Sequence, residues 1–212
     1  MRLRDQAGDR GGRREGDAIM LEIRGLDVFT TKPFQGNPTA VVLNGDGLSP
    51  EEMQAVAREL NLETTFVLRP TADRAMFRLR YFMPFREVEL CGHGTIGAIW
   101  ALAEEGTIPQ GLSELRAETP VGLLQIELEW EDARLKRVAM DQLPPKFERP
   151  GCSMEEAAQA LGIAPDAIAK TGFPLVSAST GRAKLMIPVS DWQTLDRVSP
   201  NKQALEELCR QT

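Results

Sequence analysis

Apolar residues repeat along this chain with two different periods, one typical of helices and one typical of strands. Residues 92–105 carry apolar side chains three and four positions apart, which predicts a helix with one buried face. That face is formed by Ile96, Ile99, Trp100 and Ala103. Residues 75–83 instead alternate apolar side chains with Arg78 and Arg80. This alternation predicts a strand with one face buried.

Taken along the whole chain, the two patterns predict an α+β protein built from two units. In the first half, strands are expected at 21–30, 39–43, 62–67 and 75–83, and helices beginning at 49 and 92. In the second half, strands are expected at 123–130, 135–140, 175–178 and 184–189, and helices at 153–161 and from 199. A Pro- and Gly-containing break at 119–122 separates the halves. We therefore predict a disordered extension at residues 1–19, a first domain at 20–118 and a partial second domain at 119–212.

Two of the expected helices begin with the same short pattern, one in each half of the chain. Ser49 and Ser153 each stand three residues before a glutamate, Glu52 and Glu156. In such a capping box the serine side chain accepts a hydrogen bond from the first turn, and the glutamate accepts one from the serine N–H. The pattern predicts helix N-termini at these two places.

Charge and cysteine usage narrow the classes of function. The 212 residues carry a formal net charge of -6, which argues against nucleic acid as the main partner. No stretch approaches the roughly 20 apolar residues of a membrane span. Cys91, Cys152 and Cys209 are far apart, form no CxxC pair and, with one histidine in the chain, offer no zinc set. A reduced, cytoplasmic setting is expected.

The loop Cys91–Gly94 is the strongest candidate for a ligand site, because it precedes a helix whose first N–H groups attract anions. His93, at this helix start, is suited to orienting a carboxylate or carrying a proton. Equally, it could bond only to the backbone. Cys91 is suited to acting as a nucleophile or proton-transfer thiol near the helix N-terminus. The alternative for Cys91 is a small buried apolar residue.

Two further polar residues stand beside apolar strands. Glu63 lies at the start of the strand pattern 62–67, where partial burial would raise the pKa of its carboxyl group and suit it to proton transfer. A solvent-facing glutamate at a strand edge is the commoner arrangement. Asn37 precedes Pro38 and is therefore expected to be extended, so its side chain could face a pocket or form a turn.

Four motifs, taken together and in order, carry a family resemblance. They are 27–29 with 33–42 (DVF and PFQGNPTAVV), 61–67 (NLETTFV), 80–84 (RYFMP) and 89–97 (ELCGHGTIG). The chain resembles the phenazine-biosynthesis PhzF-like isomerases, which are relatives of diaminopimelate epimerase. The resemblance covers about residue 21 to the end, and the segment beginning Ser179-Thr180-Gly181 is similar to the second half of that family. It implies two α+β domains, each a curved, mostly antiparallel sheet around a central helix, with the active site between them.

The resemblance also implies roles for individual residues. Glu63 matches the general acid/base, and Asn37, Gly92, His93 and Gly94 lie in positions that line or contact the substrate. Cys91 matches the catalytic thiol of the epimerase relatives, a position that varies in the isomerases, so Glu63 ranks above it. Family members shift protons on small carboxylate-bearing metabolites without metal or cofactor, and many are homodimers.

One departure from the family pattern affects the second domain. The loop Glu-Asp-Pro-x-Thr-Gly-Ser-Ala, which begins the central helix of that domain in the family, has no counterpart here. The expectation is an incomplete second domain, as in a truncated chain, with an apolar sheet face left exposed. A non-catalytic polypeptide that only binds a ligand or partner is the alternative to an isomerase.

Overall fold

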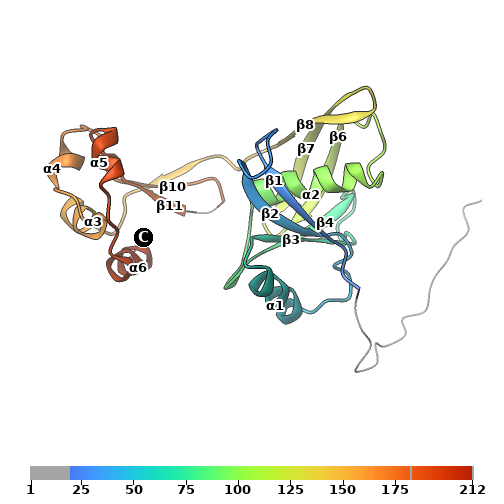
Figure 1. Cartoon of the computed structure of the whole chain (residues 1–212), viewed down its shortest axis with the longest axis horizontal. Helices are drawn as coiled ribbons and strands as arrows, with labels where there is room; N and C mark the ends of the chain where they lie inside the picture. The colour runs from blue at the N-terminus through green and yellow to red at the C-terminus, as the bar shows by residue number, and fades with distance from the viewer. Residues whose placement is uncertain (1–19, 182, 212) are drawn as a thin grey trace, which may run out of the picture.

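A computed structural model describes residues 20–181 and 183–211, and the extension predicted at residues 1–19 lies outside them. The described chain forms two groups of elements (Figure 1). The first contains an eight-stranded sheet with two helices, and the second a three-stranded sheet with four short helices. Helices and strands alternate irregularly along the chain, so the predicted α+β class is confirmed.

The large sheet mixes antiparallel and parallel pairs. Its strands are β1 (Ile23–Val28), β2 (Asn37–Val42), β3 (Thr64–Leu68), β4 (Phe77–Met83), β5 (Arg86–Val88), β6 (Glu114–Thr119), β7 (Gly122–Glu131) and β8 (Arg134–Met140). The order is β1-β2-β3-β4-β6-β7-β8, with β5 paired to β4. Only β2 with β3 and β4 with β6 run parallel, so the sheet is mostly antiparallel.

Helix α2 (Gly92–Glu104) is the centre of this group, because it packs against β1, β2, β3 and β8. The first and last strands of the sheet both contact one helix, so the sheet curls around it (Figure 1). The buried face of α2 differs from the predicted one. Ile99 is fully buried as expected, but Ile96, Trp100 and Ala103 are only partly buried. Ala98, Ala101 and Leu102 are buried as well, because the helix is covered by strands from several sides.

Helix α1 (Pro50–Leu60) covers the opposite face of the sheet. Met53 and Ala57 on the helix pack with Phe66 and Phe82 on β3 and β4. The predicted capping box is present, with Ser49 accepting from Glu52 N–H and Glu52 accepting from Ser49 N–H. The small cluster on this face and the larger one around α2 sandwich the sheet.

The domain boundary predicted at 118/119 does not match the sheet. Residues 119–122 form the tight turn between β6 and β7, where Thr119 Oγ1 donates to the Gly122 carbonyl. Both β7 and β8 then continue the first sheet, and β8 packs against α2. Pro and Gly mark turns within a hairpin as readily as breaks between domains. The first sheet therefore extends to Met140.

The second group follows and is smaller. It contains β9 (Lys146–Glu148), α3 (Met154–Leu161), α4 (Asp166–Ala169), β10 (Val176–Ser179), β11 (Ala183–Met186), α5 (Trp192–Asp196) and α6 (Lys202–Gln211). The capping box of Ser153 is confirmed at the start of α3. Helix α6 begins later than the predicted Ser199, because Asn201 accepts a hydrogen bond from the N–H of Ala204. In place of a cap, Ser199 donates its N–H to Leu161 at the end of α3.

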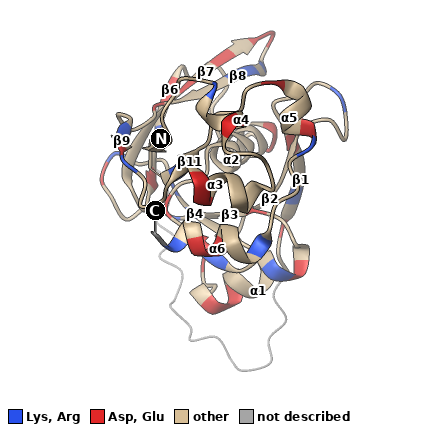
Figure 2. Cartoon of the chain, turned by 90° about the vertical axis from the view of Figure 1, so that its left-hand side faces the viewer, with Lys and Arg blue, Asp and Glu red and all other residues tan. Residues whose placement is uncertain are grey.

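Charged residues are spread over both groups. Positions of Lys and Arg are interspersed with positions of Asp and Glu along the ribbon in Figure 2. Within the described part of the chain, no helix combines the length and the apolar character that crossing a bilayer requires.

Candidate active site

Glu63 is the residue immediately before β3, and hydrogen bonds from β2 hold its backbone in place. Its backbone carbonyl accepts the Ala40 N–H at 3.1 Å and the Thr39 hydroxyl at 2.8 Å. Thr39 is fully buried, so this anchor is shielded from water. The carboxyl group beyond the anchor is 28% exposed and points toward the start of α2. The parallel pairing of β2 and β3 thus determines where the candidate acid/base lies.

The loop before α2 brings the other two candidate residues to this carboxyl group. Cys91 is the N-cap of α2, with an extended backbone and a buried side chain. His93 follows in the first turn. Glu63 Oε2 lies 3.5 Å from Cys91 Sγ and 3.1 Å from His93 Nε2. His93 Nδ1 lies 3.5 Å from Cys91 Sγ, so the imidazole ring, the thiol and the carboxylate all contact one another.

His93 is enclosed, and one of its nitrogens has no hydrogen bond. Although Nε2 is 3.1 Å from Glu63 Oε2, this pair lies outside hydrogen-bonding geometry, and Nε2 is a buried atom without a partner among the described residues. Burial lowers the pKa of His93 below its ordinary value, and the negative Glu63 and the Pro38 backbone oppose that shift only partly. His93 is therefore neutral at physiological pH, when one ring nitrogen is an acceptor.

The two glycines beside His93 have different surroundings. A Cβ on Gly92 would meet nothing within 4 Å, and Gly92 lines an open cavity. A Cβ on Gly94 would come within 2.4 Å of the Thr65 hydroxyl, so glycine is needed there for α2 to approach β3. Gly94 is buried and is not among the residues that line the cavity. The side of α2 that carries Gly94 packs against β3, whereas the side that carries Gly92 faces the cavity.

A buried hydrogen-bond chain supports the loop from inside. The Thr95 hydroxyl donates to the Cys91 carbonyl at 2.8 Å and lies 2.7 Å from the Tyr81 hydroxyl. Burial raises the pKa of Tyr81, so this phenol stays protonated. These hydrogen bonds connect the start of α2 to β4. They hold Cys91 and its neighbours in place against the sheet.

The site opens into a cavity of about 470 Å³. Its lining residues are Asn37, Glu63, Val88, Leu90, Cys91, Gly92, His93, Gln142, Thr180 and Lys184. Four of the five residues predicted to act on or bind substrate therefore meet here, and Gly94 lies behind them. Asn37, the first residue of β2, is exposed and faces this space rather than a turn.

Five lining residues were not among the predicted site residues. Val88 and Leu90 precede α2, and the other three come from beyond β8. Thr180 and Lys184 lie on the hairpin of β10 and β11, and Gln142 lies in the chain that leads to β9. A Cβ on Gly181 would be 3.0 Å from Leu90, so the hairpin approaches the first group closely at that point. The Ser179-Thr180-Gly181 motif was a sequence signal for Thr180. Nothing in the sequence singled out Gln142 or Lys184.

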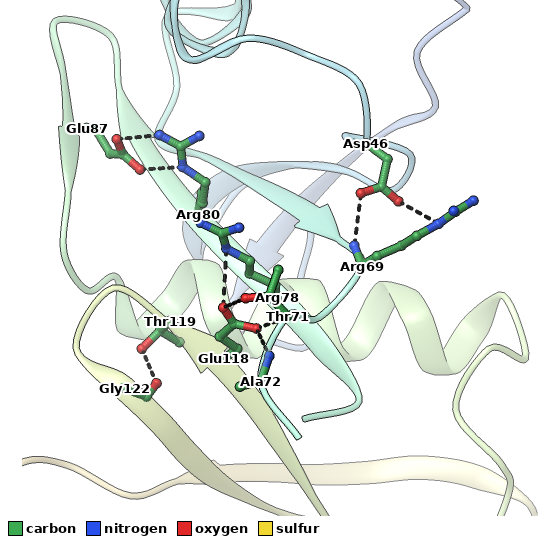
Figure 3. A network of polar contacts seen from close by, with 10 residues as sticks. All are labelled: Asp46, Arg69, Thr71, Ala72, Arg78, Arg80, Glu87, Glu118, Thr119 and Gly122. Atoms are coloured by element: carbon green, nitrogen blue, oxygen red, sulfur yellow. Dashed lines mark hydrogen bonds and ion pairs between the residues drawn. The ribbon is translucent and has the colours of Figure 1, made fainter. Parts of the chain in front are cut away.

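A larger cavity of about 730 Å³ lies beside the site, and four of its charged lining residues form ion pairs with each other. Arg80 donates two hydrogen bonds of 2.7 Å to Glu87, and Arg78 lies 3.6 Å from Glu118 (Figure 3). Glu118 also accepts from Thr71 and from the Ala72 N–H. Bidentate and multiply bonded pairs of this kind hold strands together. This network anchors β4 to β5, β6 and the loop after β3.

Comparison with known proteins fits this arrangement. A family model described as phenazine biosynthesis-like protein, PhzC-PhzF, matches residues 26–212. The chain belongs to this PhzC/PhzF family. A crystal structure of the PhzF-family phenazine biosynthesis protein of Bacillus anthracis matches with a TM-score of 0.74 and 36% identity, covering 87% of this chain and 61% of that one. The family resemblance drawn from the four motifs is confirmed.

Curated relatives of this family carry isomerase names. "Uncharacterized isomerase YfhB" of Bacillus subtilis is 30% identical over 187 residues, covering 88% of this chain and 62% of that protein. The "Trans-2,3-dihydro-3-hydroxyanthranilate isomerase" of Pseudomonas aeruginosa is 34% identical over 184 residues, covering 85% of this chain and 61% of that protein. The chain thus spans about three fifths of the length of these relatives.

More distant likeness concerns the fold alone. A hydroxyproline epimerase from Agrobacterium vitis superposes with a TM-score of 0.56 at 15% identity, over 76% of this chain. The predicted epimerase-like architecture, a curved and mostly antiparallel sheet around a central helix, is confirmed in the first group of elements. That the second domain is incomplete stays a prediction.

Proposed function

We propose that the chain carries the proton-transfer site of a PhzF-family isomerase that acts on a small carboxylate-bearing metabolite. One observation carries the proposal. The carboxyl group of Glu63 stands within 3.1–3.5 Å of His93 and Cys91, at the start of a buried helix and on the wall of a cavity. Isomerase names among relatives at 30–36% identity support the reaction class.

Glu63 is the general acid/base of the proposed reaction. Its carboxylate removes a proton from a carbon next to an electron-withdrawing group, and the resulting acid returns the proton to another carbon. The reaction moves one proton and the electron pair of a double bond, so it needs neither metal nor cofactor. Cys91 is the rival base, and its place at 3.5 Å from both Glu63 and His93 supports a role in holding or sharing the proton.

The anion that forms during the reaction needs donors, and the cavity offers two kinds. The first N–H groups of α2 have no intrahelical acceptor, and the side chain of Cys91 does not cap them. Lys184 adds a positive charge to the residues that line the cavity. We propose that the substrate carboxylate lies against Lys184, with the reacting carbon at Glu63 and Asn37, Gly92 and His93 in contact with the substrate.

The wider setting follows from the same proposal. The name of the Pseudomonas relative suggests a cyclic amino- and hydroxy-substituted carboxylate as one substrate to test. We propose a cytoplasmic homodimer, in keeping with the separate cysteines and the family resemblance. Neither nucleic acid nor membrane is an expected partner, given the acidic net charge of -6 and the mixed charges.

Proton exchange in deuterated water tests the role of Glu63. The protein is incubated with trans-2,3-dihydro-3-hydroxyanthranilate and other small carboxylic acids, and deuterium incorporation is followed by NMR. Glu63→Gln should slow exchange by at least about a hundredfold, because a positioned base contributes about 10²–10⁴-fold. Glu127→Gln, on an exposed carboxylate of β7, is the matched control and should exchange normally. Equal exchange in both variants would contradict the assignment.

A pair of alkylating reagents matched in size but different in charge tests Lys184 without knowledge of the substrate. Iodoacetate and iodoacetamide have nearly the same size, and only the first brings a carboxylate into the cavity to Cys91. Lys184→Met should lower the iodoacetate-to-iodoacetamide rate ratio at Cys91 by about two- to fivefold, as expected for one partly solvated charge, and Lys184→Arg should restore it. The exposed Cys209 gives the internal reference by peptide mass spectrometry. An unchanged ratio would remove Lys184 from the site.

A further inference from the structure

Three donor atoms of different chemistry converge at one point of the cavity. A Glu63 oxygen, Cys91 Sγ and a ring nitrogen of His93 all lie within 4.8 Å of one another. Around a tetrahedral Zn²⁺, with bonds of about 2.0–2.3 Å, neighbouring ligand atoms are about 3.3–3.6 Å apart. The Oε2–Sγ separation is 3.5 Å and the Oε2–Nε2 separation is 3.1 Å. Two edges of such a tetrahedron are therefore almost in place without a ligand.

The state of His93 suits a metal better than a hydrogen bond. Its Nε2 is buried and lies near Glu63 in a geometry that forms no hydrogen bond. Buried nitrogens in proteins are normally paired, so an atom of this kind requires an explanation. A neutral imidazole binds a metal through its unprotonated ring nitrogen, and Nε2 is the ring nitrogen that lies beside Glu63.

The ligand set also determines which ion fits. One thiolate, one imidazole and one carboxylate are the donors of zinc sites, whereas Mg²⁺ and Ca²⁺ prefer oxygen alone. Because the three residues line a cavity, a fourth position stays open for water. Sequence spacing did not reveal this set, since Glu63 is 28 residues before Cys91.

We propose that Glu63, Cys91 and His93 bind a single Zn²⁺ ion and that this ion switches the site off. On binding, the Cys91 thiol releases its proton to solvent and becomes the thiolate ligand, with no change in oxidation state. The lone pair of Glu63 is then donated to the metal and cannot take a proton from carbon. Metal binding stands apart from the function proposed above, whereas the inhibition rests on it.

Cobalt spectroscopy tests the site independently of activity. The purified chain, stripped of metal with a chelator, is titrated with Co²⁺. We expect a thiolate-to-cobalt charge-transfer band in the near ultraviolet and visible d–d bands of a tetrahedral ion, both removed by one equivalent of Zn²⁺. Absence of the charge-transfer band in the unmodified protein would overturn the proposal.

Single substitutions then identify the ligands. Cys91→Ser and Cys91→Ala should each abolish the charge-transfer band, and Cys152→Ser, the matched control, should leave it unchanged. Glu63→Gln and His93→Ala should each weaken Zn²⁺ binding by more than about tenfold, since losing even an outer partner of a metal ligand costs 10–100-fold. A band that persists in both Cys91 variants would overturn the proposal.

Inhibition is measured by the deuterium-exchange assay. Stoichiometric Zn²⁺ should stop exchange, and a chelator should restore it. Exchange that continues with Zn²⁺ bound would overturn the switch. Cobalt binding without exchange in the metal-free protein supports the metal site and counts against the isomerase proposal. Exchange in a protein that does not bind cobalt supports the isomerase proposal and overturns the metal site.

Discussion

The two groups of elements bury their apolar residues to different degrees. Around α2, a continuous core joins β3, β4, β6, β7 and β8 and includes the fully buried Leu79, Ile99 and Ile126. In the second group, the buried cluster is Ala157, Ala158 and Ile168. Large side chains on and near its small sheet stay exposed. They are Phe147 (67%), Phe173 (70%), Met186 (52%) and Trp192 (74%).

This difference shows where the stability of the chain resides. Burial of apolar area is the main favourable term in folding, and two small alanines contribute little of it. The first group also holds the candidate acid/base and the helix start, so proton-transfer chemistry stands on its rigid part. The second group adds Gln142, Thr180 and Lys184 from a less buried unit. Regions with few buried contacts open more easily than a core.

The largest test replaces one fully buried isoleucine in each group. Ile99→Ala should lower the free energy of unfolding by about 2–5 kcal/mol, because α2 is enclosed and a cavity cannot collapse. Ile168→Ala should cost less, since its buried neighbours are alanines. Urea unfolding followed by hydrogen exchange and mass spectrometry resolves the two regions. An equal loss in both would mean that they unfold as one body.

A smaller test uses the capping box that both groups share. Ser49→Ala and Ser153→Ala each remove one cap hydrogen bond, worth about 0.5–2 kcal/mol. The free energy lost with the cap hydrogen bond should be similar in the two helices. Amide protection against exchange should nevertheless fall further in α3 than in α1, because less packing supports α3. Peptide-level hydrogen exchange gives both values. The comparison fails if α1 loses more protection than α3.

The smallest expected effect is a dependence on pH confined to the first group, which holds the chain's one histidine. The pKa of His93 is lowered by folding, so the unfolded chain binds more protons as pH falls. Its contribution to stability is complete above the unfolded pKa of about 6.5 and is lost as pH drops through the folded value. The unfolding free energy of the protein relative to His93→Gln should therefore decrease on acidification. A pH-independent difference would contradict the buried, neutral imidazole.

Local patterns predicted most of the elements correctly. The capping boxes at Ser49 and Ser153, the strand 75–83 and the helix after Cys91 all appear, since each depends on residues close in sequence. The predicted boundary at 118/119 falls inside the β6–β7 hairpin, because a Pro–Gly turn looks the same inside a hairpin and between domains. Strands β5, β6 and β9 and helices α4 and α5 were missed. All of these except β6 have five residues or fewer, which is too few to show a period.

The sequence by itself determined the family, through four ordered motifs, and it singled out Glu63, Asn37 and the loop at Cys91 as candidates. It could not determine how these segments meet. Parallel pairing of β2 with β3, and the curl of the sheet around α2, bring a glutamate within 3.1–3.5 Å of a thiol and an imidazole 28 and 30 positions later. Lys184 reaches the same cavity from a hairpin. Such contacts depend on the path of the whole chain, because no local preference encodes a distance between segments that only packing brings together.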